Sequence, residues 1–158
     1  MIKTIAIIGG GPAGLMAAEV ISAQGMHVDL YDSMSSLGRK FLMAGKSGLN
    51  ITHSDPFDVF VTRYDKRRER IESMLKVFGA GQVCMWVHGL GIETFVGTSG
   101  RVFPVGMKAS PLLRAWLTRL NASGVTFHLR HKLTGILADK SLHFLTPDGD
   151  VTVKADAV

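Results

Sequence analysis

Residues 5–23 read IAIIGGGPAGLMAAEVISA, an apolar run followed by a glycine turn and an Ala-rich segment. The apolar run, residues 5–8, predicts a strand, and residues 15–23 predict a helix. The glycines between them have the spacing G-x-G-x-x-G. In a strand–turn–helix context this spacing predicts a dinucleotide-binding site.

The three glycines of the motif each have a physical task. Gly9 permits the tight turn, Gly11 lets the backbone approach a pyrophosphate, and Gly14 lets the helix and strand pack closely. The phosphate would lie at the helix N-terminus, where unpaired amides meet the positive end of the helix dipole, so that no lysine is needed. Pro12 suits the first helical turn, because its missing N–H has no partner there.

A second strand is predicted at residues 27–31, where apolar and polar side chains alternate. Asp32 follows at its carboxyl end, about 20 residues past the glycines, where the ribose-binding acid of such sites is expected. A carboxylate there can accept hydrogen bonds from both ribose hydroxyls and would repel a 2′-phosphate. The alternative is a glycine-rich turn in an ordinary βαβ unit, with Asp32 as a solvated strand end.

The composition is that of an ordinary globular chain. Its 158 residues, 46% of them apolar, are enough for one domain with a packed core. No apolar run approaches the roughly 20 residues of a membrane span, and residues 1–3 lead into a strand, not a signal peptide. The single Cys84 cannot form an internal disulfide framework. We therefore expect a cytoplasmic protein without a membrane partner.

The net charge of +5 raises the question of nucleic acid. The basic residues are mostly scattered, and the densest cluster, residues 66–70, is explained more simply as a solvated helix face. We expect no nucleic-acid partner. Three other cations, Arg39, Lys40 and Lys46, lie in one glycine-punctuated segment and would serve an anionic cofactor.

That segment, residues 33–53, has no steady period beyond a short helical turn near residues 38–44. Its three glycines, among cations and polar side chains such as Ser47 and Asn50, predict a loop that approaches a polar ligand closely. A flexible surface loop is the alternative.

Four segments together resemble a bacterial family of FAD-dependent oxidoreductases, some of them labelled aminoacetone oxidase or NAD(P)/FAD-dependent oxidoreductase. They read GGGPAGLMAA at residues 9–18, LGRKFL at 37–42, GKSGLNITH at 45–53 and GRVFPVGMKA at 100–109. Much of the family reads Gly-Gly-Gly-Arg-Cys-Asn-x-Thr-Asn where this chain has residues 45–53. The usual arginine and cysteine are Gly48 and Leu49 here, so no flavin-side role is carried over from that cysteine.

The resemblance implies an α/β fold, a Rossmann-like FAD-binding domain of the glutathione-reductase type, with a parallel sheet, an antiparallel β-meander and a small helical and hairpin insertion. Residues 1–54 would be its first part, residues 55–107 the insertion, and residues 108–158 the truncated remainder. The chain would be the N-terminal portion of a flavin-dependent oxidoreductase, inactive in isolation and prone to self-association. The alternative is a non-catalytic module that binds NAD or FAD.

The implied cofactor is FAD, with NAD or NADP as a candidate electron donor in the longer protein and an unidentified small molecule as substrate. In flavoproteins of the glutathione-reductase type, backbone at the entry to the meander meets the adenine, which here corresponds to residues 131–133. The predicted cofactor-binding residues are Gly9, Gly11, Pro12, Ala13, Gly14, Asp32, Ser33, Gly38, Arg39, Lys40, Ser47, Asn50 and Leu133.

Further elements follow from local patterns. Asp55-Pro56 predicts an N-cap and first-turn proline for a helix, and Ser110-Pro111 predicts the same for another. The expected helices span residues 57–64, 70–78, 82–90 and 111–120. The expected strands are a hairpin at 92–96 and 101–105, a third parallel strand at 125–129, a meander at 134–139, 142–146 and 151–154, and the start of another strand at 155–158.

Two groups of residues resemble incomplete sites. Cys84 and His88, at i and i+4 of a helix, are half of a metal site, and we expect a packed thiol beside a hydrogen-bonded histidine without a metal. Ser47, His53 and Asp55 lie close in sequence, but nothing in the sequence orients them as a triad. An ordinary polar loop is the simpler interpretation, so the sequence names no catalytic residue.

Overall fold

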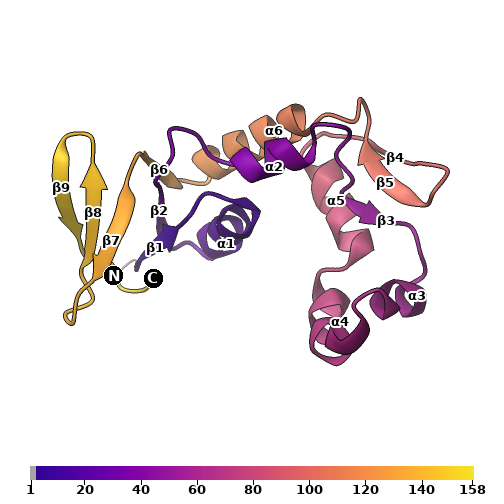
Figure 1. Cartoon of the computed structure of the whole chain (residues 1–158), viewed down its shortest axis with the longest axis horizontal. Helices are drawn as coiled ribbons and strands as arrows, with labels where there is room; N and C mark the ends of the chain where they lie inside the picture. The colour runs from indigo at the N-terminus through magenta and orange to yellow at the C-terminus, as the bar shows by residue number, and fades with distance from the viewer. Residues whose placement is uncertain (1–2) are drawn as a thin grey trace. The chain divides into compact units, whose positions relative to one another are not determined.

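The computed structural model describes residues 3–158. Residues 1 and 2, which belong to the segment that argued against a signal peptide, lie outside the described residues. The chain divides into two compact units. The first is formed by Met1–Phe41 with Leu117–Val158, and the second by Leu42–Trp116. Figure 1 shows the elements of both. The functional division predicted at residues 54 and 107 stays a prediction.

A parallel sheet forms the centre of the first unit. Its strands are β1 (Thr4–Ile8), β2 (His27–Asp32) and β6 (Thr126–Leu129), in the order β1-β2-β6. Helix α1 (Pro12–Ser22) connects β1 to β2, and Ile5 lies opposite Val28. The predicted third parallel strand is confirmed, because β6 pairs in parallel with β2.

The predicted antiparallel meander is also present. It consists of β7 (Lys132–Ile136), β8 (Leu142–Thr146) and β9 (Gly149–Val153). Ala6 and Tyr31 of the parallel sheet are buried in one cluster with Leu142 and Phe144 of β8. Helix α1 lies on the opposite face of the sheet (Figure 1). This two-sided covering confirms the Rossmann-type α/β fold.

One polar pair lies within these layers and was not foreseen from the sequence. On the face that the meander covers, Asp29 of β2 is 17% exposed and its Oδ1 lies 2.7 Å from Nε2 of His128 on β6. The His128 ring also stacks on Tyr31, with centroids 4.4 Å apart. Burial raises the pKa of Tyr31 to about 12, and the negative charge of the nearby Asp29 carboxylate contributes to this rise.

The predicted start of another strand at residues 155–158 takes the form of a single parallel bridge. Ala157 pairs with Ile5 on the edge of β1 that faces away from β2. The Ala6 amide donates to the Ala157 carbonyl at 2.9 Å, and the Thr4 amide donates to the Asp156 carboxylate at 2.8 Å.

The second unit contains the helices and the hairpin that were expected. Its antiparallel sheet has the order β3-β5-β4, and two of its strands form the predicted hairpin. Helices α2 and α6 each continue across the boundary between the units. The elements are α2 (Arg39–Ala44), β3 (Thr52–His53), α3 (Phe57–Thr62), the 3-10 helix η1 (Asp65–Arg67), α4 (Arg68–Val77), α5 (Ala80–Gly89), β4 (Thr94–Val96), β5 (Arg101–Pro104) and α6 (Ala109–Ala122).

Two predicted helix caps were wrong. Helix α3 begins at Phe57 with Pro56 as its N-cap residue and no side-chain cap, because the Asp55 carboxylate is held by Arg63 instead. Helix α6 begins at Ala109, so Ser110 lies inside its first turn and is not the cap. At α3 the contact of Asp55 with Arg63 overrides the predicted cap. At α6 the helix starts one residue before the predicted cap.

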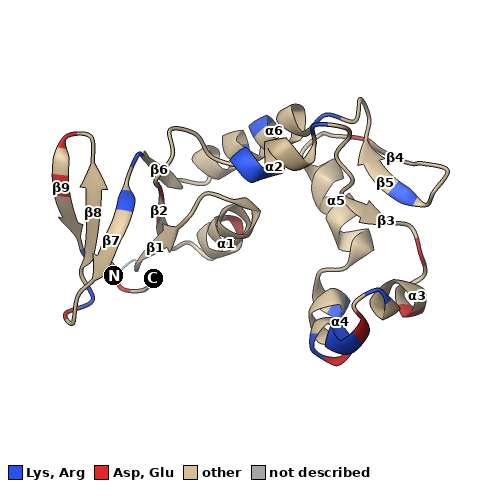
Figure 2. Cartoon of the chain, in the orientation of Figure 1, with Lys and Arg blue, Asp and Glu red and all other residues tan. Residues whose placement is uncertain are grey.

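The cations of residues 66–70 are exposed, on η1 and the start of α4, as the sequence suggested. Figure 2 shows both basic and acidic residues there, and the Arg68 Nε lies 3.7 Å from the Glu72 carboxylate. None of the helices within residues 3–158 is long and apolar enough to cross a bilayer.

The turn between β7 and β8 generates a testable prediction. The buried Ser141 donates from its hydroxyl to Asp139 Oδ1 at 2.6 Å and from its amide at 3.0 Å. These bonds, assisted by Lys154, lower the pKa of Asp139 from 3.8 to about 2. A lowered carboxyl pKa stabilises the fold above the unfolded value and loses that effect as the pH falls through the folded value.

We therefore expect Ser141→Ala to raise the pKa of Asp139 from about 2 toward 3.8. The part of the stability difference from wild type that depends on pH should be largest above pH 3.8 and should be lost as the pH falls to about 2. NMR titration of the carboxyl carbon measures the pKa, with Ser73→Ala as an exposed control. An unchanged pKa in Ser141→Ala would contradict the assignment.

Candidate functional site

The glycine motif forms the turn between β1 and α1. Gly9 has φ +104°, a left-handed value that favours glycine, and its amide donates to the Tyr31 carbonyl at 2.8 Å. Gly11 is the N-cap residue of α1, and Pro12 and Ala13 begin the helix. The first-turn amides of α1 therefore sit directly after the turn, at the end of β1, as an anion site requires.

Two glycines of the motif differ in what a side chain would meet. A Cβ on Gly14 would overlap the Gly9 carbonyl oxygen and lie 3.3 Å from the Ile7 side chain. A Cβ on Gly11 would meet no protein atom within 4 Å. Gly14 thus permits close packing of helix on turn, whereas the space beside Gly11 is left open by the protein.

Asp32 is fixed by two backbone amides. Its Oδ2 accepts the Gly10 amide at 2.7 Å, and its Oδ1 accepts the Met34 amide at 2.8 Å. Each oxygen keeps a second lone pair for a further donor. Ser33, which lies between Asp32 and Met34 in the sequence, is exposed. The carboxylate of β2 is therefore tied directly to the glycine turn of β1.

Gly10 was missed as a functional residue, because the motif leaves its position unspecified. Besides donating to Asp32, it accepts the Gly38 amide at 2.8 Å on its carbonyl oxygen. A side chain on Gly10 would overlap the buried Leu37. The run of three consecutive glycines was the available signal. Gly38 is thus hydrogen-bonded to the glycine turn, and the exposed Arg39 and Lys40 at the start of α2 come next in the sequence.

The segment that enters the meander is hydrogen-bonded to the backbone of Asp32 and Met34. The His131 amide donates to the Asp32 carbonyl at 2.9 Å, and the Arg130 amide donates to the Met34 carbonyl at 3.0 Å. Leu133 packs its side chain against the core cluster of Ala6, Tyr31, Leu142 and Phe144. The structure thus brings residues 130–131 alongside the strand end that carries Asp32.

Ser47 and Asn50 belong to the second unit, unlike the other predicted cofactor-binding residues. The glycines around them serve packing. A Cβ on Gly45 would overlap Ala109, and one on Gly48, which has φ +128°, would lie 2.7 Å from the Met107 side chain. Close packing therefore explains why both positions are glycine, without a bound ligand.

His53 and His88 of the two incomplete sites are each hydrogen-bonded within the second unit. His53 Nδ1 lies 3.1 Å from Asp55 Oδ1, and His53 Nε2 lies 3.0 Å from the Ser99 carbonyl oxygen. His88 is hydrogen-bonded to the Thr94 hydroxyl at 2.8 Å, and burial raises the pKa of Cys84. Within residues 3–158, no group of three or more His, Cys, Asp or Glu is placed to hold a metal ion.

The family comparison bears on almost the whole chain. The family model described as "HI0933-like protein Rossmann domain" matches residues 3–158. This match confirms the family resemblance that the ordered motifs indicated and the Rossmann-type fold.

Three solved structures share the fold at low sequence identity. THI4 from Thermovibrio ammonificans is 15% identical with a TM-score of 0.58, and the match covers 98% of this chain and 54% of THI4. The 3-ketosteroid-Δ4-(5α)-dehydrogenase from Rhodococcus jostii RHA1 is 13% identical with a TM-score of 0.70, covering 99% and 44%. A flavocytochrome c3 fumarate reductase is 16% identical with a TM-score of 0.69, covering 99% and 33%. The chain spans 33% to 54% of these proteins' own lengths.

The contrast between Gly11 and Gly14 gives a matched pair of variants. Gly11→Val should fold, because its side chain enters open space, but should lose ADP binding, because that space is where the pyrophosphate would lie. Gly14→Val should fail to fold, since it overlaps backbone. Circular dichroism and a calorimetric titration with ADP measure both properties. A folded Gly11→Val that binds ADP as wild type does would refute the site.

Proposed function

The chain belongs to the HI0933-like Rossmann-domain family, and on this premise we propose that it is the FAD-binding portion of a flavin-dependent oxidoreductase. The observation that carries the proposal is the 2.7 Å hydrogen bond from the Gly10 amide to Asp32. It fixes a ribose-binding acid beside a glycine turn that opens a helix. These are the two parts that an adenine dinucleotide needs next to each other.

The residues of the first unit fit the adenosine-diphosphate half of FAD. The pyrophosphate would lie over Gly11, which presents no side chain, at the positive end of α1. The ribose hydroxyls would donate to the second lone pairs of the two Asp32 oxygens. Backbone at residues 131–133 would face the adenine, because His131 is bonded to the Asp32 carbonyl.

Asp32 also limits the class of nucleotide. A fixed carboxylate favours two ribose hydroxyls and repels a 2′-phosphate, so this site suits FAD or NAD and not NADP. Two proteins that share the fold support the choice of FAD. The name of the flavocytochrome c3 fumarate reductase denotes a flavin, and that of the 3-ketosteroid dehydrogenase denotes oxidation chemistry. NAD or NADP, as electron donor of the longer protein, would then act outside the Asp32 site.

The remaining predicted residues would orient the cofactor. Gly9 and Gly14 shape the turn, and Arg39 and Lys40 would add positive charge near the pyrophosphate. A polar contact of Ser47 and Asn50 with the cofactor stays a prediction from the sequence. FAD, when bound, supplies the redox chemistry for oxidation of a small-molecule substrate, and the protein supplies binding, orientation and electrostatics.

The identity of the cofactor can be measured directly. We expect the longer protein that contains this chain to release FAD on denaturation, identified by chromatography and by flavin absorbance before denaturation. Release of nicotinamide nucleotides alone would end the proposal of FAD and favour a nicotinamide-binding module. Turnover of the longer protein with a reductant and oxygen distinguishes an enzyme from a module that only binds flavin.

A second experiment tests the role of Asp32. Asp32→Ala removes two charge-assisted hydrogen bonds to the ribose, each worth about 1.5 to 3 kcal/mol at most, so ADP binding should weaken by one to several powers of ten. The preference of ADP over 2′-phosphorylated ADP should narrow as well. Asp148→Ala, an exposed acid of the same unit, is the control. A loss below roughly threefold would show that Asp32 does not bind the ribose.

A further inference from the structure

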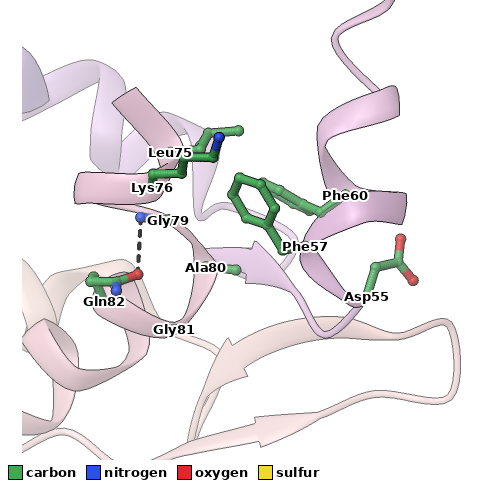
Figure 3. A pocket seen from close by; sticks show the side chains of 9 residues that line it. All are labelled: Asp55, Phe57, Phe60, Leu75, Lys76, Gly79, Ala80, Gly81 and Gln82. Carbon is green, nitrogen blue, oxygen red and sulfur yellow. Dashed lines mark hydrogen bonds between the residues drawn. The ribbon is translucent and has the colours of Figure 1, made fainter. Parts of the chain in front are cut away.

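A cavity of about 390 Å³ lies in the second unit and has no part in nucleotide binding as proposed above. It opens to solvent and is bordered by α3 on one side and by the α4–α5 corner on the other (Figure 3). Its volume falls in the range of small-molecule sites, about 300 to 1,000 Å³. The lining residues are Asp55, Phe57, Phe60, Leu75, Lys76, Gly79, Ala80, Gly81 and Gln82.

The walls of the cavity are aromatic and aliphatic. Figure 3 shows Phe57 and Phe60 reaching from α3 toward Leu75 and the methyl group of Ala80. Phe60 is half-buried and packs edge-on against Tyr64, with centroids 6.0 Å apart. Phe57 is 40% exposed, so a large part of its ring is left to water at the cavity. A flat apolar group would bury that ring.

The acceptor groups of the cavity are already occupied. The Asp55 carboxylate accepts the Arg63 Nε–H at 2.8 Å and lies 3.1 Å from His53 Nδ1. The Gln82 side-chain oxygen accepts the Gly79 amide at 3.1 Å. A cationic ligand would therefore have to compete with Arg63 and His53 for the Asp55 carboxylate.

The donor groups of the cavity are not fully used. Gln82 keeps its side-chain NH2, which has no acceptor among the described residues. The Lys76 ammonium is 63% exposed and has three hydrogens, with Glu72 at 3.0 Å as its ion-pair partner. Gly81 has no side chain, and a Cβ there would meet no atom within 4 Å, so the approach to these donors stays open.

We propose that this cavity binds a small planar aromatic carboxylate, with its ring against Phe57 and its carboxylate at the Lys76 ammonium. The aromatic wall selects the flat body, and the surplus of donors over free acceptors selects the anionic end. The cavity is lined by residues of the second unit alone.

The probe for this site is 2-naphthoate, with 2-naphthalenemethanol as its neutral counterpart. We expect the amide NMR signals of residues 79–82 to shift on titration with naphthoate, with or without ADP. Phe57→Ala should weaken binding of both probes about tenfold. Its control is Phe78→Ala, which removes a ring of matched exposure, 41%, from outside the cavity lining and should change neither affinity.

Charge variants test the anionic end separately. Lys76→Met should weaken naphthoate binding about fivefold or more and leave the alcohol unchanged, while Lys66→Met should affect neither. Glu72→Gln should strengthen naphthoate binding, because it removes the carboxylate that shares the Lys76 ammonium.

Equal binding of naphthoate and the alcohol, an unaltered affinity in a folded Phe57→Ala, or signal changes mapping away from residues 79–82 would each overturn the proposal. Loss of ADP binding in the same samples would instead concern the nucleotide site alone.

Discussion

The hydrogen bond between the Gly10 amide and the Asp32 carboxylate is the constraint on which the rest of the first unit depends. It joins the ends of two adjacent parallel strands, and the same aspartate also accepts the Met34 amide. The backbone of residue 32 then receives the His131 amide, and Gly10 receives that of Gly38. Asp32 thereby orders the glycine turn and the segment after β2 through its carboxylate, and the entry to the meander through its backbone carbonyl.

Much of this arrangement was predictable because it is encoded locally. The motif glycines lie between an apolar run and an Ala-rich helix, and Asp32 closes an alternating strand, so spacing alone predicted their meeting. β6 was predictable because it follows directly on a helix. The meander was predictable from turns such as Asp139-Lys140-Ser141, where Lys140 has φ +64°.

The parts that escaped prediction depend on partners distant in sequence. Asp29 reads as one polar position in a strand, and its pairing with His128, 99 residues away, needs the sheet order. Asp55 has the local chemistry of a cap, but Arg63 competes for its carboxylate. β3 is only two residues long and exists because it pairs with β5. The cavity beside Phe57 likewise needs three helices to be placed before it can be recognised.

The pairing of β2 with β6 also sets an order for folding. β1 and β2 are joined by a short helical connection and can pair as soon as α1 has formed. Asp29, by contrast, lies opposite Thr126, and the entire second unit is inserted between them. Contacts of such long sequence separation form slowly, because the intervening loop must close first. During synthesis on the ribosome the free edge of β2 therefore stays unpaired until the second unit has been made, and rapid folding of that unit would shorten the exposure of this edge to other nascent chains.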